Sequence, residues 1–251
     1  MKKRLQSKAA LLGAVVAAGI ITSAPPAAAE PGGKAHMYEV TITNATRGQP
    51  VAPSVIATHN NAFRLFELGP APLPGDSGYD DYFALAAMAE TGYPFHVLDQ
   101  VSATDGVWEA VPLPVAGRTP PVLLPGESNS VMISASGKAR YLSAVAMLGR
   151  TNDAVYALRG VPLPKHIGQK VDFLANAYDV GSESNDESAA TVGALGSTED
   201  DGASGTGINT NGEGYIHVHA GIHGVGGPDG LSPAADDWRD PVVQVRIERI
   251  Q

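Results

Sequence analysis

Apolar and polar residues alternate strictly near both ends of the chain. In residues 38–44, YEVTITN, and in residues 241–250, PVVQVRIERI, every second side chain is apolar over most of the run. A period of two predicts β-strands that bury one face and expose the other. We therefore expect the first and last strands of the folded domain at these two places.

Short apolar runs, separated by Pro, Gly and Asn, occupy most of the chain between these ends. They predict further strands within residues 121–136, 139–148, 170–180 and 212–222. One helix is expected, within residues 76–92, where acidic residues come first and a glycine comes last. Many short strands with a single short helix predict an all-β protein, an antiparallel β-sandwich with long loops. The longest loop is expected at residues 182–214, which are rich in Ser, Gly, Asp, Glu, Asn and Thr and should be solvated.

The beginning of the chain has the composition of a secretory signal peptide. Residues 2–8 contain four basic side chains, residues 9–21 are apolar, and an Ala-x-Ala sequence ends at Ala29. The apolar run is too short to span a bilayer comfortably. We expect a signal peptide at residues 1–29, a disordered tether at residues 30–37, and one β-sandwich domain at residues 38–251, secreted and without a transmembrane segment.

Charge and cysteine content narrow the possible partners. The chain has 17 Lys and Arg against 26 Asp and Glu, for a net charge of −9. The expected signal peptide holds four of the basic residues and none of the acidic ones, so the mature chain is more acidic still. This charge disfavours nucleic acid and anionic membranes as main partners and leaves an extracellular protein or glycan. There is no cysteine, so no disulfide stabilises the protein outside the cell.

Two aspartates stand where an apolar strand runs into a turn. Asp153 ends the sequence GRTND, and Asp179 lies in AYDVG. On neighbouring strands such ends can meet at one edge of a sandwich, and carboxylates on flexible loops suit Ca²⁺. An Asp that follows Asn in a turn also commonly bonds its own backbone, so the spacing leaves both interpretations open.

Three histidines form a second candidate metal site. His217 and His219 are two residues apart in the sequence HVHAGIH, and His223 follows four residues later. Imidazoles two apart on a strand can share Zn²⁺ or Cu²⁺, although structural hydrogen bonds near a loop are an equally ordinary use of them. The sequence contains no Gly-x-Ser-x-Gly, His-Glu-x-x-His or phosphate-loop motif, which favours a protein that is not an enzyme.

Two motifs resemble the spondin domain, the N-terminal module of F-spondin and mindin, in its bacterial secreted form. They are LSAVAMLGRTNDAVYAL at residues 142–158 and AYDVGSESN at residues 177–185, with LLPGES and DWRDPVVQVRIERI as supporting matches. The resemblance extends over about residues 38–250. It implies a β-sandwich with one bound Ca²⁺, held by Asp153 and Asp179. A glutamate is the family's third ligand, and Glu127 in PGES is the nearest candidate.

The sequence thus supports three hypotheses. The first is a secreted, calcium-binding recognition or adhesion module that is not an enzyme, with Glu127, Asp153 and Asp179 as ligands. The second is an exported metalloenzyme that uses His217 and His219 together with His223. The third is a structural envelope protein that binds no metal.

Overall fold

The computed structural model describes residues 34–195 and 212–251, and it is built mainly of antiparallel strands. The strands are β1 (His36–Asn44), β2 (Val55–His59), β3 (Gly69–Pro70), β4 (Val107–Pro112), β5 (Ser128–Ala135), β6 (Tyr141–Met147), β7 (Ala154–Pro162), β8 (Lys170–Asp179), β9 (Tyr215–Val218) and β10 (Val243–Arg249). The helices are α1 (Tyr79–Thr91), α2 (Phe95–Ala103), α3 (Pro233–Asp236) and the 3₁₀ turn η1 (Gly193–Leu195). The predicted all-β class is confirmed.

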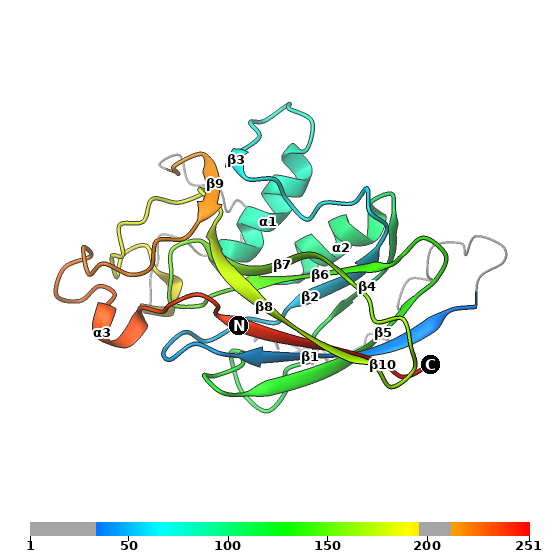
Figure 1. Cartoon of the computed structure of the whole chain (residues 1–251). Coiled ribbons are helices and arrows are strands. Elements are labelled where there is room, and N and C mark those ends of the chain that lie inside the picture. Colours follow the sequence, from blue (N-terminus) through cyan, green and yellow to red (C-terminus); the bar gives the residue numbers. More distant parts are fainter. Residues whose placement is uncertain (1–33, 196–211) are drawn as a thin grey trace, which may run out of the picture.

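The main sheet has the strand order β4-β2-β6-β7-β8-β10-β1-β5, and β9 pairs with both β8 and β3 beside this path. It folds over so that two layers face each other (Figure 1). The two outermost strands of the path also meet, because Trp108 Nε1 on β4 donates to Ser134 Oγ on β5 over 3.1 Å. The result is a β-sandwich that is nearly closed along this side.

The layer made of β5, β1, β10 and β8 exposes one of its faces to solvent. Along β1 and β10 the buried residues alternate with partly exposed ones, and Val40, Ile42, Val245 and Ile247 are fully buried. They pack into the core between the two layers. The two alternating segments seen in the sequence are therefore strands with one buried face, as predicted.

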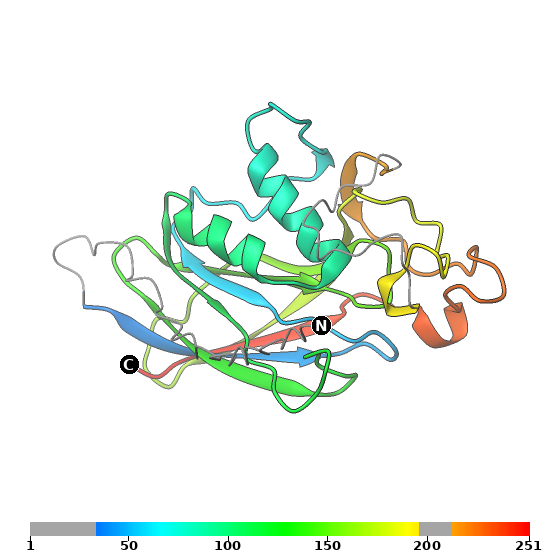
Figure 2. The same ribbon diagram turned by 180° about the vertical axis from the view of Figure 1, so that it is seen from behind.

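In the second layer β2 and β6 are buried on both faces, and α1 and α2 pack against the outer side of this layer (Figure 2). Leu85 and Met88 of α1 belong to one hydrophobic cluster with Val145 of β6 and Val155 of β7. A strand covered on both sides has no polar face, so its sequence is apolar without alternation. This explains the continuous run LSAVAM, in which every residue after Tyr141 is buried in β6.

The prediction of a single helix is wrong. Gly92, with φ of 69°, ends α1, and α2 begins only three residues later at Phe95. α2 is nine residues long, and its buried residues are Val97 and Val101, one turn apart. So short a stripe is hard to distinguish from a strand by pattern alone. No helix in residues 34–195 and 212–251 is long and apolar enough to cross a membrane.

Two predicted segments end elsewhere than expected. The tether was predicted to end at residue 37, but β1 already begins at His36. Residues 34 and 35 come directly before β1, and residues 1–33, which include the predicted signal peptide, lie outside the described residues. The prediction that residues 182–214 form a solvated loop is wrong for its first part. Ser182, Glu183 and Val192 are buried there, and residues 196–211 lie outside the described ranges.

Candidate metal centre

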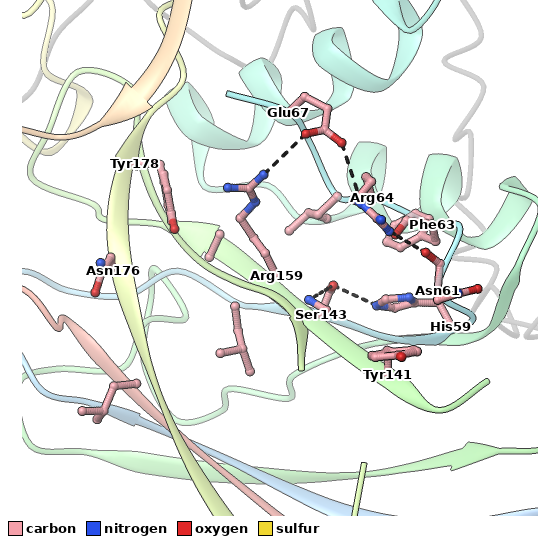
Figure 3. A pocket seen from close by; sticks show the side chains of 15 residues that line it. His59, Asn61, Phe63, Arg64, Glu67, Tyr141, Ser143, Arg159, Asn176 and Tyr178 are labelled. Carbon is pink, nitrogen blue, oxygen red and sulfur yellow. Dashed lines mark hydrogen bonds and ion pairs between the residues drawn. The ribbon is translucent and has the colours of Figure 1, made fainter. Parts of the chain in front are cut away.

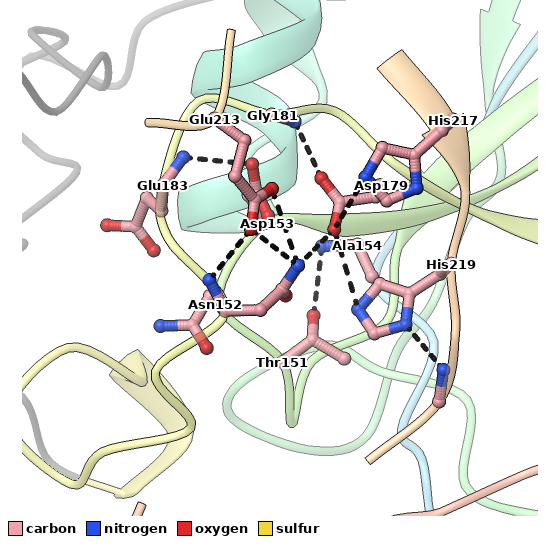
Figure 4. A network of polar contacts seen from close by, with 12 residues as sticks. Thr151, Asn152, Asp153, Ala154, Asp179, Gly181, Glu183, Glu213, His217 and His219 are labelled. Carbon is pink, nitrogen blue, oxygen red and sulfur yellow. Dashed lines mark hydrogen bonds and ion pairs between the residues drawn. The ribbon is translucent and has the colours of Figure 1, made fainter. Parts of the chain in front are cut away.

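Strand pairing places the two predicted aspartates beside the histidine segment. Asp153 immediately precedes β7, and Asp179 is the last residue of β8. In the register of the sheet Asp179 stands opposite Ala154 on one side and opposite His217 of β9 on the other. The aspartate site and the histidine site, which the sequence presented as two alternatives, therefore lie at one place (Figure 4).

Asp153 is a fully buried carboxylate that organises a distant turn. Its Oδ2 accepts hydrogen bonds from the backbone N–H of Ser182 over 2.6 Å and from that of Glu183 over 3.0 Å. The local turn is closed by Thr151 instead, whose Oγ1 accepts from the N–H of Ala154 over 3.1 Å. Asp153 Oδ1 is buried and has no hydrogen-bond partner among the described residues. Asp153 thus fixes the chain that follows β8 and keeps one carboxylate oxygen unused.

Asp179 lies at the centre of the polar network. Its Oδ1 accepts from the N–H of Gly181 over 2.8 Å, and its Oδ2 accepts from the Asn185 amide. The Nε2 atoms of His217 and His219 each lie 3.9 Å from Asp179 Oδ2. Figure 4 shows both imidazoles pointing from the β9 segment toward this carboxylate. The carboxylate is fully buried.

The hydrogen bonds of the two imidazoles give them different tautomers. Nδ1 of His217 lies 2.9 Å from the carbonyl oxygen of Val218, which can only accept, so Nδ1 carries the proton and Nε2 has a free lone pair. Nδ1 of His219 instead accepts from the N–H of Gly221 over 2.9 Å, so the proton of the neutral ring is on Nε2. His217 can therefore bind a metal through Nε2, whereas His219 can donate a hydrogen bond to Asp179.

A third side chain with a metal-binding group comes from the turn before β9. One ligand atom each from Asp179, Glu213 and His217 lies within 4.8 Å of the other two. In this tautomer His217 Nε2 carries no proton, and the ionised Asp179 carboxylate carries none either. The distance of 3.9 Å between them is therefore not a hydrogen bond. Tetrahedral zinc sites with bonds of about 2.0–2.2 Å place neighbouring ligand atoms roughly 3.3–3.6 Å apart. The Asn185 amide nitrogen now donates to both Asp179 Oδ2 and Glu213 Oε1, so an ion would have to displace this amide while Glu213 and His217 move inward.

His219 is a buried positioning residue of this group. Its side chain is 3 % exposed and packs against Trp238, with the ring centroids 4.9 Å apart. Its Nε2 has no hydrogen-bond partner among the described residues and points at Asp179 (Figure 4). Burial lowers the pKa of His219 to about 4, so the ring is neutral at physiological pH. Carboxylates that bind metals are commonly held by such outer donors.

The acidic charge of the centre is not balanced by nearby cations. Burial, reinforced by the charge of Asp179, raises the pKa of Asp153 to about 7. Burial likewise raises the pKa of Asp179, and Glu213 adds to that effect. In the described part of the chain no Lys or Arg forms an ion pair with either aspartate. Protons or a bound cation must therefore supply the missing positive charge.

Two residues predicted from the sequence are not part of this group. The carboxylate of Glu127 lies in the turn before β5, where Arg118 binds both of its oxygens over 2.5 and 2.8 Å. These hydrogen bonds lower the pKa of Glu127. His223 is exposed, and its backbone N–H donates to Glu187. Among the described residues, the three histidines do not form a group whose ligand atoms lie within 4.8 Å of one another.

Glu213 is the member of this group that was not predicted from the sequence. It falls in the segment that was predicted to be a solvated loop. It also lies at the beginning of residues 212–222, where a strand was predicted, and its position four residues before His217 was the available signal. A turn directly before a strand can carry an acid back over the first residues of that strand.

Comparisons with known proteins leave the family open. No family model matches the chain, and no curated protein matches it. The spondin resemblance therefore remains a hypothesis that depends on the sequence motifs. Function has to be inferred from the geometry of the centre.

Proposed function

We propose that this protein is an exported metal-binding β-sandwich protein that acts by recognition and not by catalysis. Its ion would bind to Asp179, Glu213 and His217. The proposal depends on one observation: one ligand atom from each of the three residues lies within 4.8 Å of the other two. The buried, unpartnered Nε2 of His219 beside Asp179 is independent support, because a neutral donor at that place would hold the carboxylate for the ion.

The set of ligand atoms favours zinc over calcium. Two carboxylates and one imidazole nitrogen are ordinary zinc ligands, and a fourth position is open to water. Calcium takes six to eight oxygen ligands and has little affinity for imidazole. The sequence predicted Ca²⁺ with Glu127, but that carboxylate is bound to Arg118. We therefore replace Ca²⁺ by Zn²⁺ and Glu127 by Glu213, and keep Asp179.

Asp153 has a supporting role in this proposal. It holds the N–H groups of Ser182 and Glu183, and so sets the path of the chain that carries Asn185 to the Asp179 carboxylate. Its unused Oδ1 is a possible acceptor for a water on the ion. An ion at Asp179 would neutralise part of the charge that raises the pKa of both aspartates.

A bound ion would tie the segment of residues 213–217 to the end of β8. In and directly after that segment two large apolar side chains are exposed, since Tyr215 and Val218 are each 49 % exposed. Exposed aromatic and aliphatic residues beside a fixed loop are suited to contact with another molecule. An extracellular protein or glycan is the partner that the acidic charge and the expected signal peptide favour. The expected signal peptide is also the reason why we propose that the protein is secreted.

Melting curves of the purified protein test the proposal. After removal of metal by a chelator, Zn²⁺ at 100 times its dissociation constant should stabilise the fold by about 2.7 kcal/mol. Ca²⁺ at the same concentration should leave the midpoint almost unchanged. His217→Gln should abolish the response to Zn²⁺, whereas His166→Gln, at an exposed histidine elsewhere, should retain it. No shift with Zn²⁺ in the unaltered protein, or an equal shift in His217→Gln, would refute the proposed site.

A further inference from the structure

A pocket of about 570 Å³ lies on a different face of β8 from the metal centre. It opens between the strands β6, β7 and β8 and the segment of residues 59–67 (Figure 3). Tyr178 lines it, while the next residue, Asp179, points the other way, as successive residues of a strand do. The pocket and the metal centre are therefore separate sites that can be tested independently.

The polar floor of the pocket is fixed and uncharged. His59 Nδ1 lies 2.7 Å from the carbonyl oxygen of Asn60, so Nδ1 carries the proton and Nε2 accepts from the Ser143 hydroxyl over 2.9 Å. Ser143 Oγ in turn accepts from the N–H of Gly160 over 2.9 Å. Burial lowers the pKa of His59, which keeps the ring neutral. The floor itself therefore needs no rearrangement before a ligand enters.

The rim of the pocket carries two arginines. The guanidinium of Arg159 lies 4.6 Å from the ring centroid of Phe66 and 5.6 Å from that of Tyr178, and its Nη2 donates to the Phe66 carbonyl over 2.9 Å. These contacts hold the planar group in place, and most of its five N–H donors remain for other partners. Arg64 stands on the facing segment (Figure 3). The lining thus bears two positive charges and one negative charge, in a chain with a net charge of −9.

Glu67 occupies the space between the two arginines only loosely. Its carboxylate oxygens lie 3.8 Å from Arg64 Nε and 3.9 Å from Arg159 Nη2, and its side chain is 74 % exposed. Charge-assisted hydrogen bonds between guanidinium and carboxylate are about 2.7–2.9 Å long. The two arginines therefore have unused capacity for a carboxylate that approaches more closely. An exposed ion pair of this kind is also cheap to break.

We propose that this pocket binds a small organic carboxylate. The carboxylate of the ligand displaces Glu67 and binds to Arg159 and Arg64. Its apolar or aromatic body enters the pocket along Tyr178 and Tyr141, toward the floor formed by Ser143 and His59. The aromatic walls supply apolar contact, and the arginines supply the charge that selects an anion.

Ligand-observed NMR and calorimetry with defined probes test this proposal. The probes are 3-phenylpropionate and indole-3-acetate, each compared with its neutral amide, on the full chain treated with chelator. We expect saturable binding of at least one carboxylate and at least tenfold weaker binding of its amide. Glu67→Gln, which removes the competing carboxylate, should strengthen binding severalfold. Arg159→Gln should weaken it at least tenfold.

Two controls keep the result interpretable if Arg159→Gln disturbs the fold. Arg64→Gln changes a largely exposed side chain and removes its hydrogen bonds to the carbonyl oxygens of Asn61 and Phe63, so it should weaken binding with only a small fall in melting temperature. Arg246→Gln removes an exposed ion pair between β10 and Asp172 of β8, neither of which lines the pocket, and should leave binding unaltered. The proposal is overturned if neither carboxylate binds the unaltered protein, if the amides bind equally well, or if Arg64→Gln and Arg159→Gln both bind as the unaltered protein does.

Discussion

His217 Nε2 lies 3.9 Å from Asp179 Oδ2, and the hydrogen bond from His217 Nδ1–H to the Val218 carbonyl leaves that Nε2 with a free lone pair. His219 Nε2 lies at the same distance from the same oxygen, but Gly221 donates to its Nδ1 and the proton is on Nε2. Two imidazoles at equal distances from one carboxylate are thus prepared for different tasks. One can bind an ion, and the other can position the carboxylate.

Substitution of the two histidines should therefore have unequal effects on zinc binding. His217→Gln removes a ligand and should reduce zinc affinity at least 100-fold. His219→Gln removes an outer hydrogen-bond donor and should reduce the affinity roughly 10–100-fold. Calorimetric titration of the metal-free variants with Zn²⁺ measures both. Equal losses in the two variants would mean that the tautomers have been assigned incorrectly.

The two glutamates should separate the structural assignment from the sequence-based one. Glu213→Gln should weaken zinc binding at least tenfold, because the carboxylate is one of the three grouped ligands. Glu127→Gln should leave it unchanged, since its carboxylate is bound to Arg118. The same titration decides the matter. Loss of zinc affinity in Glu127→Gln alone would restore the ligand set that the sequence predicted.

Asp153→Asn should change the pH dependence of stability in the metal-free protein. The pKa of Asp153 is raised to about 7 by burial and by Asp179, from an unfolded value of 3.8. The fold therefore holds this proton more tightly than the unfolded chain. The associated stability is present below about pH 4 and is lost as the pH rises through about 7.

Asparagine cannot ionise, so the stability of Asp153→Asn relative to the unaltered protein should rise between about pH 4 and pH 7 and then level off. Denaturant unfolding in the presence of a chelator at each pH gives this difference. Asp172→Asn serves as the control, because Asp172 is exposed on β8 and Arg246 lowers its pKa. A flat difference for Asp153→Asn across this range would contradict the raised pKa.

Ser143→Ala should destabilise the fold by about 1–3 kcal/mol, because it leaves His59 Nε2 and the N–H of Gly160 without a partner at a buried place. Ser130→Ala, which removes a part-buried hydroxyl pair with Thr41, should cost less. Urea unfolding of both variants provides the comparison. An effect of Ser143→Ala no larger than that of Ser130→Ala would show that the floor of the pocket is not preorganised.

The sequence predicted the layer of β5, β1, β10 and β8 well, and the second layer, which the helices cover, less well. β1 and β10 alternate because solvent contacts one face, and this pattern is local. β6 is covered by α1, and α2 packs beside α1 on β4 and β2, so neither the strand pattern nor the helix pattern is complete alone. The second helix was missed for that reason.

The candidate centre was predictable in part. Asp179, His217 and His219 were each selected from the sequence, but only the register between β8 and β9 shows that they share one site. Glu213 reaches the centre from a turn, and Glu127 is removed from consideration by Arg118, which lies nine residues earlier in the chain. The path of the loops in three dimensions determines which side chains become partners. The composition of a loop does not reveal that path.

The most direct test of the central claim is a crystal structure of the protein grown with Zn²⁺ and measured at the zinc absorption edge. We expect one anomalous peak per chain, within about 2.0–2.2 Å of a carboxylate oxygen of Asp179, a carboxylate oxygen of Glu213 and Nε2 of His217. His219 Nε2 should then lie within hydrogen-bond distance of Asp179. No peak at this place, or a peak bound by other residues, would contradict the proposed centre.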